Sequence, residues 1–164
     1  RLGAAGILAV CPYYNRPSQA GIDAHMRAIA ASTDLPIIVY DIPVRSGRKI
    51  SSASLLKMAR EVKNIVALKD AAGNPGETAN VINQAPAGYE VYSGDDGMTL
   101  PLMAVGAVGT IGVATAWTGT DHQLLFDLWE AGDVVGARKV NGAWKLSRRT
   151  VYVDTVNPMY KPAK

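Results

Sequence analysis

A lysine at the end of an apolar run is the residue of this sequence best suited to covalent chemistry. Lys69 follows the run Ile65–Leu68 and precedes Asp70. An amine at the end of a buried strand loses hydration, which disfavours the ammonium form and lowers its pKa. The neutral amine is the form that attacks a ketone to make an imine. From this feature alone, the alternative is a strand-end lysine whose amine extends into solvent.

Two side chains near the end of the preceding apolar run fit chemistry at such an amine. Tyr40 ends that run, and its phenol can relay a proton during imine formation, although packing is the alternative role for a strand tyrosine. Arg45 lies between Pro43 and Gly47, and a guanidinium can bind a carboxylate through two hydrogen bonds. Without further context, a solvated loop arginine is the alternative.

Aromatic and small residues follow the other apolar runs. Tyr13 and Tyr14 lie between prolines, and consecutive side chains of an extended segment point in opposite directions. One ring can therefore face a site while the other faces a neighbouring chain. The segments Tyr92–Asp96 and Gly109–Gly112 place glycines beside polar residues, which leaves room for a ligand.

The apolar runs alternate with amphipathic segments, a pattern typical of βα units around a parallel sheet. We expect strands at Gly6–Val10, Ile37–Ile42, Ile65–Lys69, Tyr89–Ser93 and Thr110–Thr115. We expect helices to begin at Ser18, at Ser51 or Ser52, at Asn74, at Asp95 or Asp96, at Thr120 or Asp121, and at Asp133, the last running to about Arg149. The fold class is α/β. A closed (β/α)₈ barrel has eight strands, so five indicate a barrel completed by sequence outside this chain, or an open sheet.

Composition excludes several other classes of protein. The 164 residues are 48% hydrophobic and 19% charged, as in a soluble globular protein, and the net charge of +3 is too small and scattered to predict nucleic-acid binding. The apolar runs are shorter than the roughly 20 residues that span a bilayer, and the first residues lack the pattern of a signal peptide. We therefore expect a cytoplasmic protein without membrane partners.

The cysteine and histidines point to no metal or disulfide chemistry. Cys11 is the only cysteine, which excludes an internal disulfide, and its apolar surroundings predict a buried thiol rather than a reactive one. His25 and His122 have no partner at metal-ligand spacing. Asp95 and Asp96 suit helix capping better than magnesium binding.

Five segments, in order, resemble the strand-end motifs of the dihydrodipicolinate synthase / N-acetylneuraminate lyase family of pyruvate-dependent class I aldolases. They are CPYYNRPSQAG, VYDIPVRSG, IVALKDAAGN, YSGDD and GTIGVAT, and the resemblance extends from Gly6 to Pro158. It implies a (β/α)₈ barrel to which residues 1–132 contribute about five βα units. Residues 133–164 would begin a C-terminal helical region.

The resemblance also implies roles for individual residues. Lys69 would hold pyruvate as an imine, Tyr40 would relay protons, and Tyr14 would be a catalytic tyrosine that reaches into a neighbouring site across a dimer interface. Tyr13 would lie beside it at that interface. A homodimer or homotetramer is therefore expected, with no metal and no organic cofactor, because the iminium on the lysine is the electron sink.

The substrate follows from the same resemblance. Arg45 would bind the carboxylate of aspartate semialdehyde, and Gly94 and Ile111 would line the pyruvate pocket. The expected reaction is the condensation of pyruvate with aspartate semialdehyde in lysine and diaminopimelate biosynthesis. The arginine favours synthases, but enzymes of 2-keto-3-deoxy sugar acids and N-acetylneuraminate lyases remain an alternative. An inactive barrel fragment that serves as a binding or assembly module is another.

One family motif is absent. The Gly-Thr-Thr segment that binds the pyruvate carboxylate in the family belongs to an earlier strand, and about three βα units have no counterpart in these residues. We therefore expect the chain to be part of a longer protein, or to receive the missing strands from another chain. Alone, it should have little or no condensing activity.

Overall fold

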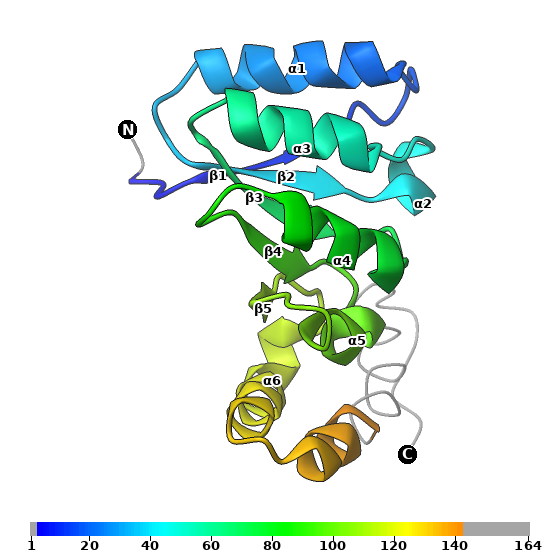
Figure 1. Ribbon diagram of the computed structural model, residues 1–164, viewed down its shortest axis with the longest axis vertical. Helices are drawn as coiled ribbons and strands as arrows, with labels where there is room; N and C mark the ends of the chain where they lie inside the picture. Colours follow the sequence, from blue (N-terminus) through cyan, green and yellow to red (C-terminus); the bar gives the residue numbers. More distant parts are fainter. Residues whose placement is uncertain (1–2, 143–164) are drawn as a thin grey trace, which may run out of the picture. The chain divides into compact units, whose positions relative to one another are not determined.

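The computed structural model of this protein describes residues 3–142. The strands there are β1 (Ile7–Val10), β2 (Ile37–Asp41), β3 (Ile65–Asp70), β4 (Glu90–Ser93) and β5 (Gly109–Thr110). The helices are α1 (Gln19–Ala31), α2 (Pro43–Ser46), α3 (Ser52–Glu61), α4 (Pro75–Gln84), the 3₁₀ turn η1 (Asp96–Met98), α5 (Thr99–Met103) and α6 (Thr115–Glu130). Strands and helices alternate along the chain, which confirms the α/β prediction (Figure 1).

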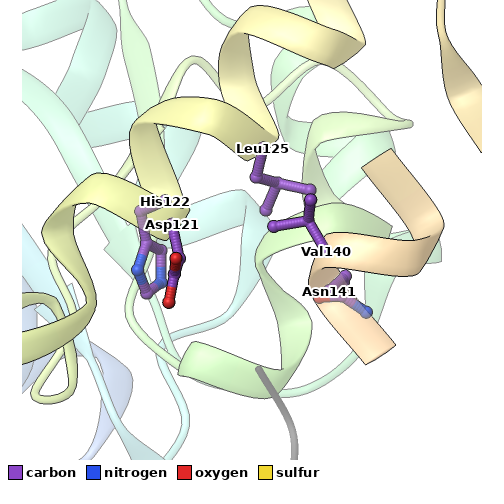
Figure 2. Close-up of a pocket in the computed structure, with 5 residues that line it drawn as sticks. All are labelled: Asp121, His122, Leu125, Val140 and Asn141. Atoms are coloured by element: carbon purple, nitrogen blue, oxygen red, sulfur yellow. The ribbon is translucent and has the colours of Figure 1, made fainter. Parts of the chain in front are cut away.

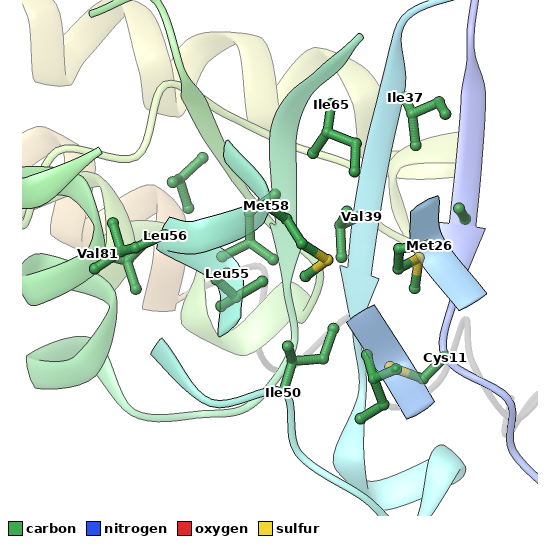
Figure 3. Close-up of a cluster of buried hydrophobic side chains, with 14 of the residues drawn as sticks. Cys11, Met26, Ile37, Val39, Ile50, Leu55, Leu56, Met58, Ile65 and Val81 are labelled. Atoms are coloured by element: carbon green, nitrogen blue, oxygen red, sulfur yellow. The ribbon is translucent and has the colours of Figure 1, made fainter. Parts of the chain in front are cut away.

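The five strands form one parallel sheet in the order β1-β2-β3-β4-β5. Helices α1, α3 and α4 lie side by side along it (Figure 1). Their apolar residues pack with alternate strand residues into a buried core, to which Met26 of α1, Met58 of α3 and Val39 of β2 contribute (Figure 3). The strand residues that alternate with these core residues point to the opposite face of the sheet, where Leu8 keeps 46% of its surface exposed. Among the described residues, the sheet therefore has one face covered by helices and one open face.

Most helix starts lie where the sequence predicts them. The side chain of Ser18 accepts a hydrogen bond from the amide of Gly21, and that of Ser51 accepts one from Ser54. Asn74 caps α4, whose first residue is a proline. These side chains satisfy amides that have no partner inside the helix, which is why polar residues mark the helix starts in the sequence.

Three predictions about secondary structure differ from what the structure shows. The strand expected at Thr110–Thr115 ends at Thr110, and Thr115 already begins α6, earlier than the predicted start at Thr120 or Asp121. Thr118 has non-helical backbone angles inside α6, so the predicted start lies just beyond a kink in a longer helix. The segment that carries Arg45, expected as a loop, is the short helix α2. Its proline start and the left-handed glycine that follows it are the usual signs of helix ends.

The chain divides into two units, Arg1–Ile111 and Gly112–Lys164. The second contains α6 and a helical segment at residues 134–142, in which the carboxylate of Asp133 accepts a hydrogen bond from the amide of Gly136, as predicted for a cap. The predicted end of that helix near Arg149 lies outside the described residues. The division at residues 132 and 133 into a partial barrel and a C-terminal helical region stays a prediction.

Candidate active site

Two of the residues expected to do chemistry, Lys69 and Tyr40, lie in one row with Tyr92 across the open face of the sheet. The strand register pairs Tyr40 with Lys69, Lys69 with Tyr92, and Tyr92 with Gly109. Because neighbours in a parallel sheet point to the same face, the three side chains are adjacent. The row lies near the carboxyl ends of the strands, where ligands bind in barrels of this type.

Lys69 and Tyr40 are in direct contact. The amine nitrogen of Lys69 lies 3.9 Å from the centre of the Tyr40 ring, and only 8% of the lysine is exposed. Burial lowers the pKa of the Lys69 amine, although the nearby carboxylate of Asp96 opposes the shift. The neutral, nucleophilic form is thereby favoured relative to a lysine in water.

Tyr40 keeps its proton more firmly than a tyrosine in water. Burial raises the pKa of its phenol, the positive charge of Arg45 lowers it, and Asp95 and Asp96 raise it further. Arg45 is therefore close enough to act electrostatically on Tyr40, and its side chain is exposed on α2. A protonated phenol next to a neutral amine is an arrangement that can pass a proton to a reacting group.

Gly94 leaves the space that the lysine occupies. A Cβ atom on Gly94 would lie 2.9 Å from both Cγ and Cε of Lys69 and 3.1 Å from the Cβ of Ala71. Carbon atoms prefer separations of about 3.5–4.0 Å, so a side chain at this position would displace the lysine. Ile111 is attached to the neighbouring strand end through its amide, which donates to the carbonyl of Ser93 at 2.8 Å. The structure thus places Gly94 against Lys69 and Ile111 next to the end of β4.

Tyr92 completes the row on the other side of Lys69. Its hydroxyl donates to the carboxylate of Glu90, two residues earlier on β4, and this bond raises the pKa of the phenol. A Cβ on Gly109 would lie 2.9 Å from the Tyr92 ring, so the glycine provides the space for the ring. Because it is bound to Glu90, the Tyr92 phenol is a poorer proton donor to substrate than Tyr40.

The two adjacent tyrosines lie in the segment after β1, and their rings are exposed by 69% for Tyr13 and 95% for Tyr14. Arg16 ties this segment to the one after α2, since its carbonyl accepts a hydrogen bond from Arg48. Its side chain also packs against Gly47, where a Cβ would lie 2.7 Å from Nε. The structure thus holds this segment beside the one that carries Arg45, and among the described residues both tyrosine rings stay exposed.

Two buried carboxylates behind the row were not singled out in the sequence. Asp41 and Asp70 directly follow Tyr40 and Lys69, and they point to the helix-covered face. Asp70 accepts hydrogen bonds from the amide of Ala72 at 2.8 Å and the hydroxyl of Thr78 at 2.7 Å. The sequence does show an acidic residue directly after each of these two candidates. Because successive side chains of a strand alternate between faces, that residue points to the face opposite the candidate.

Two hollows in the structure differ in size and in the residues that line them. A groove of about 430 Å³ lies on the open face, below the row formed by Tyr40, Lys69 and Tyr92. Its lining includes Leu8, Ile38, Ala67 and Tyr92. In the second unit, residues around His122 and Asn141 line a gap between α6 and the segment 134–142 that admits no water-sized molecule (Figure 2). That gap is a narrow space between two packed helices and is too small to be a ligand site.

Residues 3–142 contain neither a metal-binding cluster nor a membrane-spanning helix. No group of three or more histidine, cysteine or acidic side chains there is arranged to hold a metal ion. No helix in the same part of the chain has both the length and the apolar character needed to cross a membrane.

Cys11 is fully buried, and burial together with the charge of Asp41 raises the pKa of its thiol to about 11, as expected for an unreactive cysteine.

A lysine amine against a tyrosine ring at the carboxyl edge of a parallel sheet invites comparison with known proteins. The model of the dihydrodipicolinate synthetase family matches residues 1–151. The chain belongs to this family. The resemblance seen in the five strand-end motifs is thereby confirmed.

Individual members of the dihydrodipicolinate synthetase family agree with this assignment. The 4-hydroxy-tetrahydrodipicolinate synthase of Moorella thermoacetica is 51% identical over 136 residues, which cover 83% of this chain and 46% of the relative. The crystal structure of dihydrodipicolinate synthase from Aquifex aeolicus superposes with a TM-score of 0.87 at 36% identity, covering 93% of this chain and 52% of that one. The Acinetobacter baumannii enzyme, in a chloride-inhibited form complexed with pyruvate, gives 0.85 at 33% identity, covering 94% and 53%. The chain thus spans about half the length of these relatives.

Proposed function

We propose that this chain carries the Schiff-base half of a 4-hydroxy-tetrahydrodipicolinate synthase, which condenses pyruvate with aspartate semialdehyde. The observation that carries the proposal is the contact between the Lys69 amine and the Tyr40 ring at 3.9 Å, with the lysine almost fully buried. Family membership and the names of the relatives support it.

In the proposed first step, the neutral amine of Lys69 attacks the keto carbon of pyruvate. One proton of the attacking amine passes to the keto oxygen and Tyr40 donates a second, so that loss of water leaves an iminium on the lysine. The Tyr40 phenolate then takes a methyl proton, which restores the phenol and gives the enamine, whose carbon attacks the aldehyde. The pyruvate complex of the Acinetobacter relative is consistent with a keto-acid pocket in this family.

Other residues take roles in this proposal according to their positions. Arg45, exposed beside Tyr40, would bind the carboxylate of the aldehyde substrate. Gly94 and Ile111 would line the pyruvate pocket next to Lys69. Tyr13 and Tyr14, whose rings are exposed, would lie at a dimer interface, Tyr14 serving the neighbouring site.

Borohydride trapping tests the proposal. The chain is incubated with pyruvate and sodium borohydride, digested and analysed by mass spectrometry. A pyruvate-derived substituent on Lys69, absent in Lys69→Met and in samples without pyruvate, supports the proposal. An unmodified Lys69 in folded protein would show that the chain is an inactive module.

Substrate choice requires a second assay. Product analysis with pyruvate and either aspartate semialdehyde or a sugar aldehyde distinguishes the synthase from a sugar-acid aldolase. The assay is made on the chain alone and on the chain supplemented with the N-terminal half of a relative. We expect condensation only in the supplemented sample, because no strand of the described residues 3–142 covers the open face and the groove below Lys69. Robust turnover by the chain alone would contradict that expectation.

A further inference from the structure

We propose that Asp41 and Lys49 are positioning residues for the Tyr40–Lys69 pair and act from the helix-covered face of the sheet. The inference deepens the proposed function and rests on it. It comes from a chain of polar contacts, buried at Asp41 and partly exposed at Lys49 and Glu77, that joins the strand end carrying Tyr40 to the helix that follows the strand carrying Lys69.

Asp41 anchors the end of β2. Its carboxylate is 1% exposed and accepts the amide of Ile50 at 3.1 Å and the amine of Lys49 at 3.3 Å. Its backbone carbonyl accepts the amide of Ala71 at 2.9 Å, two residues after Lys69. One residue thus holds the returning segment after α2 with its side chain and the end of β3 with its backbone.

Lys49 carries the connection onward to α4. Its amine lies 2.9 Å from the carboxylate of Glu77 in the first turn of α4, and it also donates to the carbonyl of Ile50 at 3.1 Å. Burial of Asp41 raises the pKa of its carboxyl, which the contacts with Ile50 and Lys49 oppose. Lys49 therefore satisfies a buried carboxylate that is costly to leave without a partner.

Helix α4 is in turn fixed to the strand that bears the reactive amine. The hydroxyl of Thr78 donates to the carboxylate of Asp70, the residue after Lys69, at 2.7 Å. The contacts run from Asp41 through Lys49 and Glu77 to this helix, and they close a ring behind the two reactive strands. The ring limits the movement of one strand end relative to the other.

This restraint matters because the amine and the phenol meet across two strands. Tyr40 and Tyr92 flank the amine from β2 and β4, Asp96 acts on it from the segment after β4, and Arg45 acts on Tyr40. If the strand ends separate, water reaches the amine and the ammonium form gains stability. The fraction of neutral amine at a given pH then falls.

The test compares Asp41→Asn with Lys49→Met. The measured quantity is the rate at which Lys69 is methylated by formaldehyde and cyanoborohydride, followed by mass spectrometry as a function of pH. The chain unfolded in urea provides the reference for each variant. If the residues acted only through their charges, removing the negative charge of Asp41 would favour the neutral amine, and removing the positive charge of Lys49 would disfavour it. Positioning predicts instead that both variants change in the same direction.

We expect both variants to move the midpoint of the pH profile upward. A shift of half a unit to one unit lowers the methylation rate near neutral pH about 3- to 10-fold. The matched control is Arg27→Met, since Arg27 also bridges two carboxylates, those of Asp23 at 2.9 Å and Glu61 at 2.7 Å, on the helix layer. That variant should leave the profile unchanged.

Several outcomes would overturn the proposal. Opposite shifts in the two variants would assign the effect to charge, and unchanged profiles would show that the ring of contacts does not position the pair. Circular dichroism confirms folding, and Asp41→Asn keeps the shape of the side chain and an acceptor for Ile50, so one informative variant remains if Lys49→Met unfolds. Formaldehyde labelling needs no pyruvate. A failure of the proposed function, seen as no pyruvate adduct in the unmodified chain, is therefore distinguishable from a failure of the positioning role.

Discussion

Replacing Gly94 with alanine should displace Lys69, the proposed Schiff-base lysine, without removing any functional group. The new Cβ would lie 2.9 Å from two carbons of the Lys69 side chain, about 0.6–1 Å closer than carbon atoms prefer. One of these carbons, Cγ, is near the backbone and cannot easily move, and Ala71 at 3.1 Å closes the other side. The lysine must therefore change its rotamer and leave the face of Tyr40.

The expected cost follows from this crowding. Overpacking of this kind costs about 1–3 kcal/mol. If the strain falls on the conformer in which the amine contacts Tyr40, trapping of pyruvate at Lys69 slows about 5- to 150-fold, because each 1.4 kcal/mol is a factor of ten. The assay is the initial rate of borohydride trapping at fixed pyruvate and pH, measured with the midpoint of urea unfolding.

The matched control is Gly119→Ala in α6, where an added Cβ meets no atom within 4 Å. That variant should trap pyruvate at the unmodified rate. Trapping by Gly94→Ala at the same rate, with unchanged stability, would refute the argument, since it would show that the lysine does not need the space above Gly94.

Three other predictions concern single groups. Thr78→Val should lower the free energy of unfolding by about 1–3 kcal/mol in urea titrations, because it removes the hydroxyl donor to the buried carboxylate of Asp70; an unchanged midpoint would contradict this. Cys11 should resist iodoacetamide at pH 8 in the native protein and react in urea, since it is fully buried and its pKa is raised to about 11, and rapid native alkylation would count against its burial. Lys69 should show a lower labelling midpoint in the native chain than in urea, because burial lowers its pKa below the ordinary 10.5. Its contribution to stability is then complete above the unfolded pKa and is lost as the pH falls through the folded one, and equal midpoints would disprove the shift.

The features that the sequence predicted best are those decided by neighbouring residues. Ser18, Ser51 and Asn74 each cap the helix that they precede, because the capping bond joins residues only three apart. The strand ends near Tyr40 and Lys69 were placed to within one residue, because the apolar runs are short and bounded by polar residues.

The errors lie where an apolar run does not decide between strand and helix. In the segment from Thr110 to Thr115 only Thr110 belongs to β5, because β4 pairs with Gly109 and Thr110 alone. Short runs of this kind fit a buried strand or the approach to a helix equally well. The roles of Asp41 and Asp70 were missed for a related reason, because burial on the far face depends on the helices that cover it.

The contact between Lys69 and Tyr40 itself depends on an irregularity that no local pattern predicted. Ile37 of β2 pairs with Ile65 of β3, but the next residue, Ile38, pairs with Ala67, so β3 contains one extra residue at Val66. If the pairing of Ile37 with Ile65 continued without this irregularity, Tyr40 would lie opposite Leu68, and Lys69 would point into the helix-covered core. Because a slip of one residue moves every later side chain to the other face, the extra residue brings the amine to the open face beside the phenol. The candidate residues could therefore be chosen by type from the sequence, whereas their meeting is a property of the strand pairing.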